Sequence, residues 1–200
     1  MKYIIFILFS LNCFSQENSK PQFLFDENDQ SITQDQFNNK LKDKKLEIIT
    51  YQVDTAYIGR FLRKDDFGVL SPSEKVKIQT ELEKLTGKKI DTSKTIIINF
   101  YYKDNPEPNG SCIDYYVNDK AYKKFLDKNN TINQFFITQK DYKYKDKQVY
   151  QDTNDLIRKT LFKYHFDCGN YIIIKPNGKF YRKLGEYKQN EIPQNLNRIE

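Results

Sequence analysis

At residues 95–102 the sequence reads Thr95-Ile96-Ile97-Ile98-Asn99-Phe100-Tyr101-Tyr102. This is a continuous apolar run of strand length, without the alternation of polar and apolar residues that marks a half-exposed strand. Runs of this type belong in the middle of a sheet that is covered on both faces. We therefore predict a central strand at residues 96–100 and an α/β domain built around it.

The residues on either side predict further helices and strands. Helices are expected where an N-cap residue precedes apolar residues at helical spacing, and strands where β-branched and aromatic residues cluster. In chain order the expected elements are a short helix from Thr33 to about Lys42, a strand at 46–53, a helix from Ser71 to Gly87, the run at 95–102, a helix from Cys112 to Phe125, a strand at 132–138, a helix from Asp152 to near Cys168, a strand at 171–175 and its hairpin partner at 180–184. Residues 54–71 give no clear pattern, and we expect Asp65-Asp66 to lie in a solvated loop.

The start of the chain has the features of a secretory signal peptide. A positively charged start precedes an almost purely apolar run at residues 3–11, and the small residues Cys13 and Ser15 suit cleavage before Gln16. The apolar run of about nine residues is too short for a bilayer, which needs roughly 20. We therefore expect a secreted or periplasmic protein.

These patterns divide the chain into a signal peptide at 1–15, a polar lead-in with a short helix at 16–45, and one domain at 46–200. An alternative makes Cys13 the acylated first residue of a lipoprotein, anchored to a membrane through that residue. Asn12 argues against it, because the processing enzyme prefers Gly, Ala or Ser just before the cysteine. A membrane is expected as a partner only in the lipidated form.

Charge and histidine content narrow the classes of function. The formal net charge of the chain is +6, but the lysines occur in mixed runs such as residues 140–147. Lysines interleaved with tyrosines can grip a polyanion, yet acids interrupt this run, so we expect a solvated loop and no nucleic-acid partner. The single histidine, His165, is expected to be packed or at the surface rather than catalytic. Without clustered Cys or His, we expect no metal site and no cofactor.

From residue 46 onward, the order of elements resembles the thioredoxin-like fold. Residues 95–102 are similar to the strand that leads into the family's active-site loop. The segment Tyr171-Ile172-Ile173-Ile174-Lys175-Pro176-Asn177-Gly178-Lys179-Phe180 is similar to the strand and turn that follow the family's cis-proline. The resemblance implies a central mixed sheet flanked by helices, with a C-terminal β-hairpin.

The chain departs from the family at the site of its redox chemistry. The family sets a Cys-x-x-Cys at a helix N-terminus, where the helix dipole lowers the pKa of the first thiol. Here the corresponding segment is Asn105-Pro106-Glu107-Pro108-Asn109-Gly110-Ser111-Cys112, which holds one cysteine. The family's cis-proline aligns with Gly169 and the residue before it with Cys168. The chain thus resembles a divergent member without the CxxC motif.

Three functions remain open at this point. In the first, the fold is a non-catalytic binding or structural module of the cell envelope with an unidentified protein partner, and Cys112 pairs with Cys168, as two cysteines of an exported chain are expected to do. In the second, Cys112, Cys168 or both are catalytic in thiol–disulfide exchange. The third is an unrelated envelope function on a different α/β fold, such as binding of an exported toxin or a polyanion.

We predict that the mature protein begins at Gln16, because Cys13 and Ser15 satisfy the small-residue positions of the cleavage site. The intact mass of the exported protein measures this directly. A species that starts at a lipid-modified Cys13 would instead place the protein on a membrane.

Overall fold

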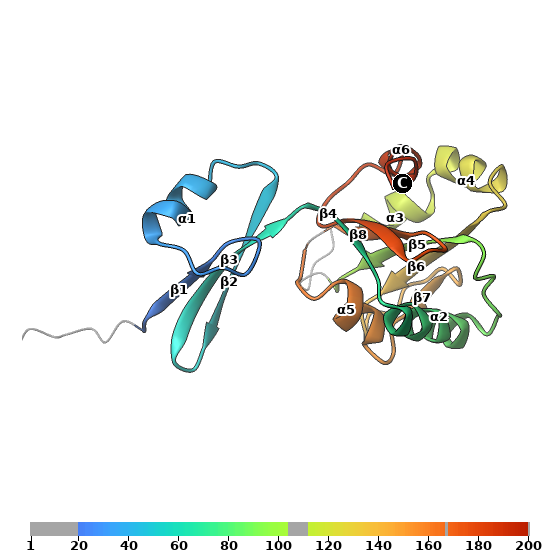
Figure 1. Cartoon of the computed structure of the whole chain (residues 1–200). Helices are drawn as coiled ribbons and strands as arrows, with labels where there is room; N and C mark the ends of the chain where they lie inside the picture. Colours follow the sequence, from blue (N-terminus) through green and yellow to red (C-terminus); the bar gives the residue numbers. More distant parts are fainter. Residues whose placement is uncertain (1–19, 104–111, 167, 200) are drawn as a thin grey trace, which may run out of the picture.

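The computed structural model describes residues 20–103, 112–166 and 168–199, so the expected signal peptide at 1–15 lies outside the described residues. The described chain forms two units, each with its own sheet (Figure 1). We call residues 20–63 the N-terminal unit and residues 65–199 the C-terminal unit. Within the described ranges, no helix is both long and apolar enough to cross a membrane.

The N-terminal unit is a three-stranded sheet that carries one helix. Its elements are β1 (Gln22–Phe25), α1 (Gln34–Lys40), β2 (Leu46–Val53) and β3 (Ala56–Arg63). Strand β3 lies in the middle, antiparallel to β2 and parallel to β1. Helix α1 starts at the expected place with a capping box, in which Thr33 and Gln36 bind each other's backbone N–H groups. Its Phe37 packs against Leu24 and Phe61 in a small core.

Two expectations for residues 46–71 are corrected by this arrangement. The strand at 46–53 exists, but it pairs with β3 rather than joining the sheet of the run at 95–102, so the larger sheet begins at Asp65. Asp65-Asp66 is not a solvated loop. Both residues begin strand β4, where Asp65 accepts a hydrogen bond from the Tyr181 hydroxyl and Asp66 pairs with Arg182.

The C-terminal unit is a six-stranded mixed sheet in the order β4-β9-β8-β5-β6-β7. Strand β5 is parallel to β6 and antiparallel to β8, and β8 forms the expected hairpin with β9. The elements of this unit are β4 (Asp65–Val69), α2 (Pro72–Thr86), β5 (Thr95–Tyr101), α3 (Cys112–Val117), α4 (Lys120–Asp127), β6 (Ile132–Thr138), β7 (Val149–Gln151), α5 (Leu156–Leu161), β8 (Asn170–Ile174), β9 (Lys179–Lys183) and α6 (Glu191–Leu196).

This connectivity is that of a thioredoxin-like fold, with β5, β6, β8 and β9 as its four core strands. The predicted α/β class, central mixed sheet and C-terminal hairpin are therefore confirmed. Three local predictions were less accurate. The helix expected from Cys112 to Phe125 is in fact two helices, because Asp119 caps a new start at α4. Helix α5 ends earlier than expected, at Leu161. Strand β7 and helix α6 were not predicted.

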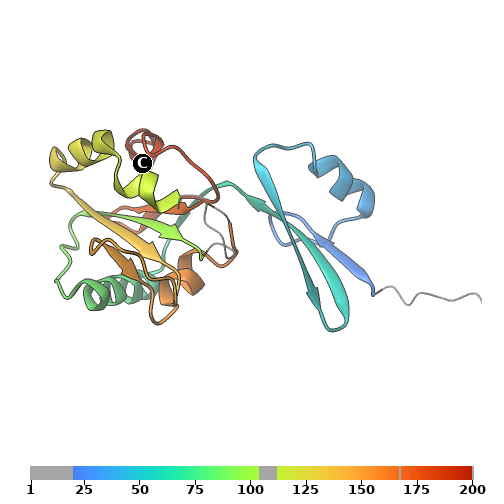
Figure 2. The ribbon, with the colours of Figure 1, turned by 180° about the vertical axis from the view of Figure 1, so that it is seen from behind.

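Helices cover both faces of the sheet, as Figures 1 and 2 show from opposite sides. Helices α2 and α5 lie on one face, and α3, α4 and α6 on the other. Alternate residues of β5 enter the two cores: Ile96, Ile98 and Phe100 pack toward α2 and α5, while Ile97 and Tyr101 pack toward α3 and α6. The uninterrupted apolar run thus reflects burial on two sides.

We predict that Ile97→Asp unfolds the C-terminal unit. Ile97 is fully buried between β6 and β8, and a buried, unpaired carboxylate costs several kcal/mol against a total stability of roughly 5–15 kcal/mol. Thermal melting followed by circular dichroism measures the loss. The control is Val69→Asp, because Val69 is 66% exposed on the edge strand β4, and similar melting of the two variants would contradict the prediction.

Candidate functional site

The two cysteines singled out by the sequence border neighbouring strand ends. Cys112 is the first residue of α3, which follows β5 along the chain, and Cys168 lies two residues before the start of β8. The register pairs Phe100 with Asn170, so the end of β5 and the start of β8 are adjacent. Cys168 is disulfide-bonded, whereas the side chain of Cys112 is outside the described residues. The candidate site is therefore this edge of the sheet.

The backbone at Cys168-Gly169 has a conformation that proline cannot adopt. Both residues have positive φ, 57° at Cys168 and 99° at Gly169, and a positive φ is uncommon for a residue with a side chain. A Cβ on residue 169 would lie 3.1 Å from Cε1 of Tyr101. Proline fixes φ near −65°, so it is incompatible with this conformation.

A pocket of about 580 Å³, which we call the Cys168 pocket, opens beside this segment. Its walls come from α3, from the start of α4, and from the loop that joins β9 to α6. The lining residues are Tyr115, Tyr116, Asp119, Ala121, Cys168, Glu186, Tyr187, Lys188, Gln189 and Asn190.

Stacked tyrosines form one wall of the Cys168 pocket. The rings of Tyr116 and Tyr187 are stacked with centroids 4.4 Å apart, and the Tyr116 hydroxyl donates a hydrogen bond of 2.8 Å to the carbonyl oxygen of Tyr187. Tyr115 is the exposed member, with 80% of its surface open to solvent. A rigid aromatic pair beside an exposed aromatic side chain suits contact with another apolar group.

A buried amide holds this wall to the central strand. Asn99 in β5 is fully buried, and its Nδ2 donates to the Tyr187 hydroxyl and, at 3.4 Å, to Oε1 of Gln189. Its Oδ1 accepts a hydrogen bond of 2.6 Å from Nε2 of Gln134. Sequence reasoning assigned no role to Asn99. The available signal was a lone amide in a strand expected to be buried on both faces, because such a group requires hydrogen-bond partners.

Burial keeps the tyrosines of this region in their neutral form. Burial raises the pKa of Tyr101 and Tyr187 well above the usual phenol value, and it raises the pKa of Tyr116 to about 12. All three stay protonated near neutral pH.

The remaining sequence candidates lie apart from the Cys168 pocket. The His165 ring packs on Tyr102 with centroids 4.6 Å apart, in the loop after α5. Among residues 20–103, 112–166 and 168–199, no three His, Cys, Asp or Glu side chains gather as a set of metal ligands.

Comparisons with known proteins add solved structures of low similarity. No family model and no curated protein matches the sequence. DsbF from MTB, in mixed oxidized and reduced forms, has 15% identity and a TM-score of 0.39 over 54% of this chain and 82% of that one. A DsbF homologue from Corynebacterium diphtheriae has 10% identity and a TM-score of 0.40, covering 54% and 73% of the two chains. A proposed thioredoxin from Neisseria meningitidis has 13% identity and a TM-score of 0.38, covering 78% and 90%. The assignment to a thioredoxin-like fold depends on the strand order given above.

We predict that Gly169→Ala destabilises the protein more than Gly87→Ala. Both glycines have positive φ, so an added Cβ costs roughly 1–2 kcal/mol at either position. At Gly87 that Cβ meets no atom within 4 Å, whereas at Gly169 it meets the Tyr101 ring. Chemical denaturation of the two variants measures the difference, and equal losses of stability would show that the Tyr101 contact imposes no constraint.

Proposed function

We propose that this protein is an exported, non-catalytic binding module of the cell envelope, with Cys112 and Cys168 joined as a structural disulfide. The observation that carries the proposal is the left-handed backbone at Cys168-Gly169. In the alignment that the resemblance implies, Gly169 stands at the position of the family's substrate-orienting cis-proline. Together with the single cysteine at the start of α3, it leaves neither part of the family's redox site in place.

The cysteine content of the chain supports this pairing. Cys168 is disulfide-bonded, and the other cysteines of the sequence are Cys13 and Cys112. Cys13 falls within the expected signal peptide, so Cys112 is the partner that remains in a mature chain. A bridge from Cys112 to Cys168 closes a loop of about 55 residues and stabilises the fold by on the order of 4 kcal/mol in the chain-entropy model.

Binding of an exported protein partner is proposed for the Cys168 pocket. Tyrosine is enriched among the residues that dominate binding energy at protein interfaces. Here the exposed Tyr115 stands beside the stacked Tyr116 and Tyr187. An extended segment of a partner that places an apolar side chain against this wall is the kind of ligand that the pocket suits.

The state of the thiols tests the proposal on the natively exported protein. We expect no alkylation of Cys112 or Cys168 before reduction, resistance to mild reductant, and no turnover of a model disulfide substrate such as insulin. The double variant Cys112→Ser/Cys168→Ser is expected to fold with a free energy of unfolding lower by on the order of 4 kcal/mol. Denaturation curves of the oxidised wild type and the double variant measure this loss.

Other outcomes of the same experiment have defined meanings. Rapid, reversible reduction with turnover would overturn the proposal and make Cys112 and Cys168 the catalytic pair of a thiol–disulfide oxidoreductase. Two free, slowly alkylated thiols in the exported protein would contradict both functions.

A further inference from the structure

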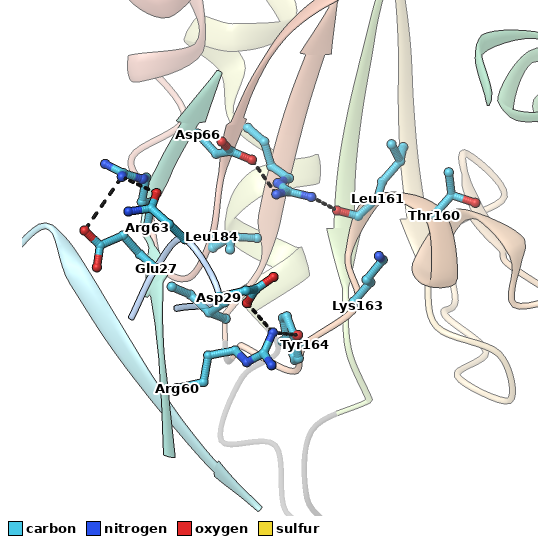
Figure 3. A pocket seen from close by; sticks show the side chains of 13 residues that line it. Glu27, Asp29, Arg60, Arg63, Asp66, Thr160, Leu161, Lys163, Tyr164 and Leu184 are labelled. Atoms are coloured by element: carbon cyan, nitrogen blue, oxygen red, sulfur yellow. Dashed lines mark hydrogen bonds and ion pairs between the residues drawn. The ribbon is translucent and has the colours of Figure 1, made fainter. Parts of the chain in front are cut away.

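A second pocket lies where the two units meet, and Figure 3 shows it from close by. This junction pocket has a volume of about 410 Å³. The N-terminal unit contributes the loop after β1 and strand β3, and the C-terminal unit contributes β4, β9, α5 and the loop after α5. The junction is supported by a 2.9 Å hydrogen bond from the Leu184 N–H to the Lys64 carbonyl oxygen. Leu62 of β3 also packs against the core of the C-terminal unit.

More cationic than acidic side chains line the junction pocket. Its cationic residues are Arg60, Arg63, Lys163 and Arg182, and its carboxylates are Glu27, Asp29 and Asp66. Each carboxylate already has a cation: Asp29 pairs with Arg60, Asp66 with Arg182, and Glu27 with Arg63 at 3.7 Å. Glu27 is in addition bound at 2.7 Å by Lys40, which is not part of the lining.

Lys163 is the cation left over. No dashed line joins Lys163 to another residue that lines the pocket, whereas dashed lines join Arg60 and Arg63 to their partners (Figure 3). Arg182 is likewise paired, with Asp66. The next residue in the sequence, Tyr164, also lines the pocket. Its hydroxyl accepts a 3.4 Å hydrogen bond from Nη1 of Arg60. The pocket therefore holds an excess positive charge beside polar hydroxyl groups.

Two of the three arginines that line the junction pocket, Arg60 and Arg182, have N–H donors that are not used in hydrogen bonds. Arg182 uses Nη1 on the Leu161 carbonyl oxygen at 2.7 Å and Nη2 on Asp66, and Arg60 uses Nη1 on Asp29 and Tyr164. The Nε–H groups of both arginines are buried and have no acceptor among the described residues. A buried donor without an acceptor is unfavourable, so an oxyanion that accepted a hydrogen bond from either group would relieve that cost.

We propose that the junction pocket binds a small oxyanion, a phosphate or carboxylate group, through Lys163 and the guanidinium groups of Arg60 and Arg182. Guanidinium groups match the oxygen geometry of both anions, and the volume is in the range of pockets for small ligands. Because Arg60 belongs to the N-terminal unit and Lys163 and Arg182 to the C-terminal unit, a bound anion strengthens the junction. This proposal is independent of the state of Cys112 and Cys168.

The test is titration calorimetry of the mature protein with inorganic phosphate and with citrate, at ionic strength matched with sodium chloride. We expect saturable binding with a one-to-one stoichiometry, and the preferred probe tells a phosphate ligand from a carboxylate ligand. Lys163→Gln is expected to weaken binding by about tenfold or more, as loss of a hydrogen bond to a charged group does. The matched control is Lys84→Gln, since Lys84 is exposed on α2 and outside the pocket lining.

Thermal melting of the same proteins is the second measurement. The preferred anion is expected to raise the melting temperature of the wild type and of Lys84→Gln, and to raise that of Lys163→Gln less at the same concentration. Without ligand, all three are expected to melt alike, because both lysines are exposed. Absence of saturable binding with either probe would overturn the proposal, and so would equal weakening by the two substitutions, which would indicate non-specific attraction to a positive surface.

Discussion

Strand β5 is buried on both faces, and the rest of the C-terminal unit is arranged around that constraint. Its alternate side chains supply two separate cores, so helices are needed on both sides of the sheet. A polar residue in such a strand must find its hydrogen bonds inside the protein. Asn99 does so by binding Tyr187 and Gln189, two residues of the loop after β9. The same contact fixes one wall of the Cys168 pocket, so core packing and the candidate binding surface depend on one amide.

Local signals in the sequence predicted what is decided locally. The apolar run gave β5, and the helix starts expected at Thr33 and Ser71 are those of α1 and α2. The sheet to which residues 46–53 belong was missed, because pairing partners are set by tertiary contacts rather than by strand propensity. The acidic start of β4 was missed for a related reason. Two adjacent aspartates resemble a solvated turn until Tyr181 and Arg182, more than a hundred residues away, satisfy them.

For the candidate sites too, the sequence identified residues but not the conformation that the fold gives them. The sequence singled out Cys168 but gave no sign of its left-handed backbone.

The two pockets are lined in part by the same two segments of the chain. The segment between α5 and β8 contributes Lys163 and Tyr164 to the junction pocket and Cys168 to the Cys168 pocket. The segment after β9 contributes Leu184 to the junction pocket and Tyr187 to the Cys168 pocket.

The strand order also determines when each unit can fold as the chain emerges. Strand β4 pairs with β9, Asp65 against Lys183, and β5 receives one of its two neighbours from β8. The larger sheet therefore stays incomplete until nearly the whole chain is free. The N-terminal unit has all its strand pairs within residues 22–63, so its loops close early and at low entropic cost. Vectorial release thus favours an intermediate in which the N-terminal unit is folded and β5 has β6 but not β8 beside it. The open edge of this apolar strand is then a hazard for aggregation.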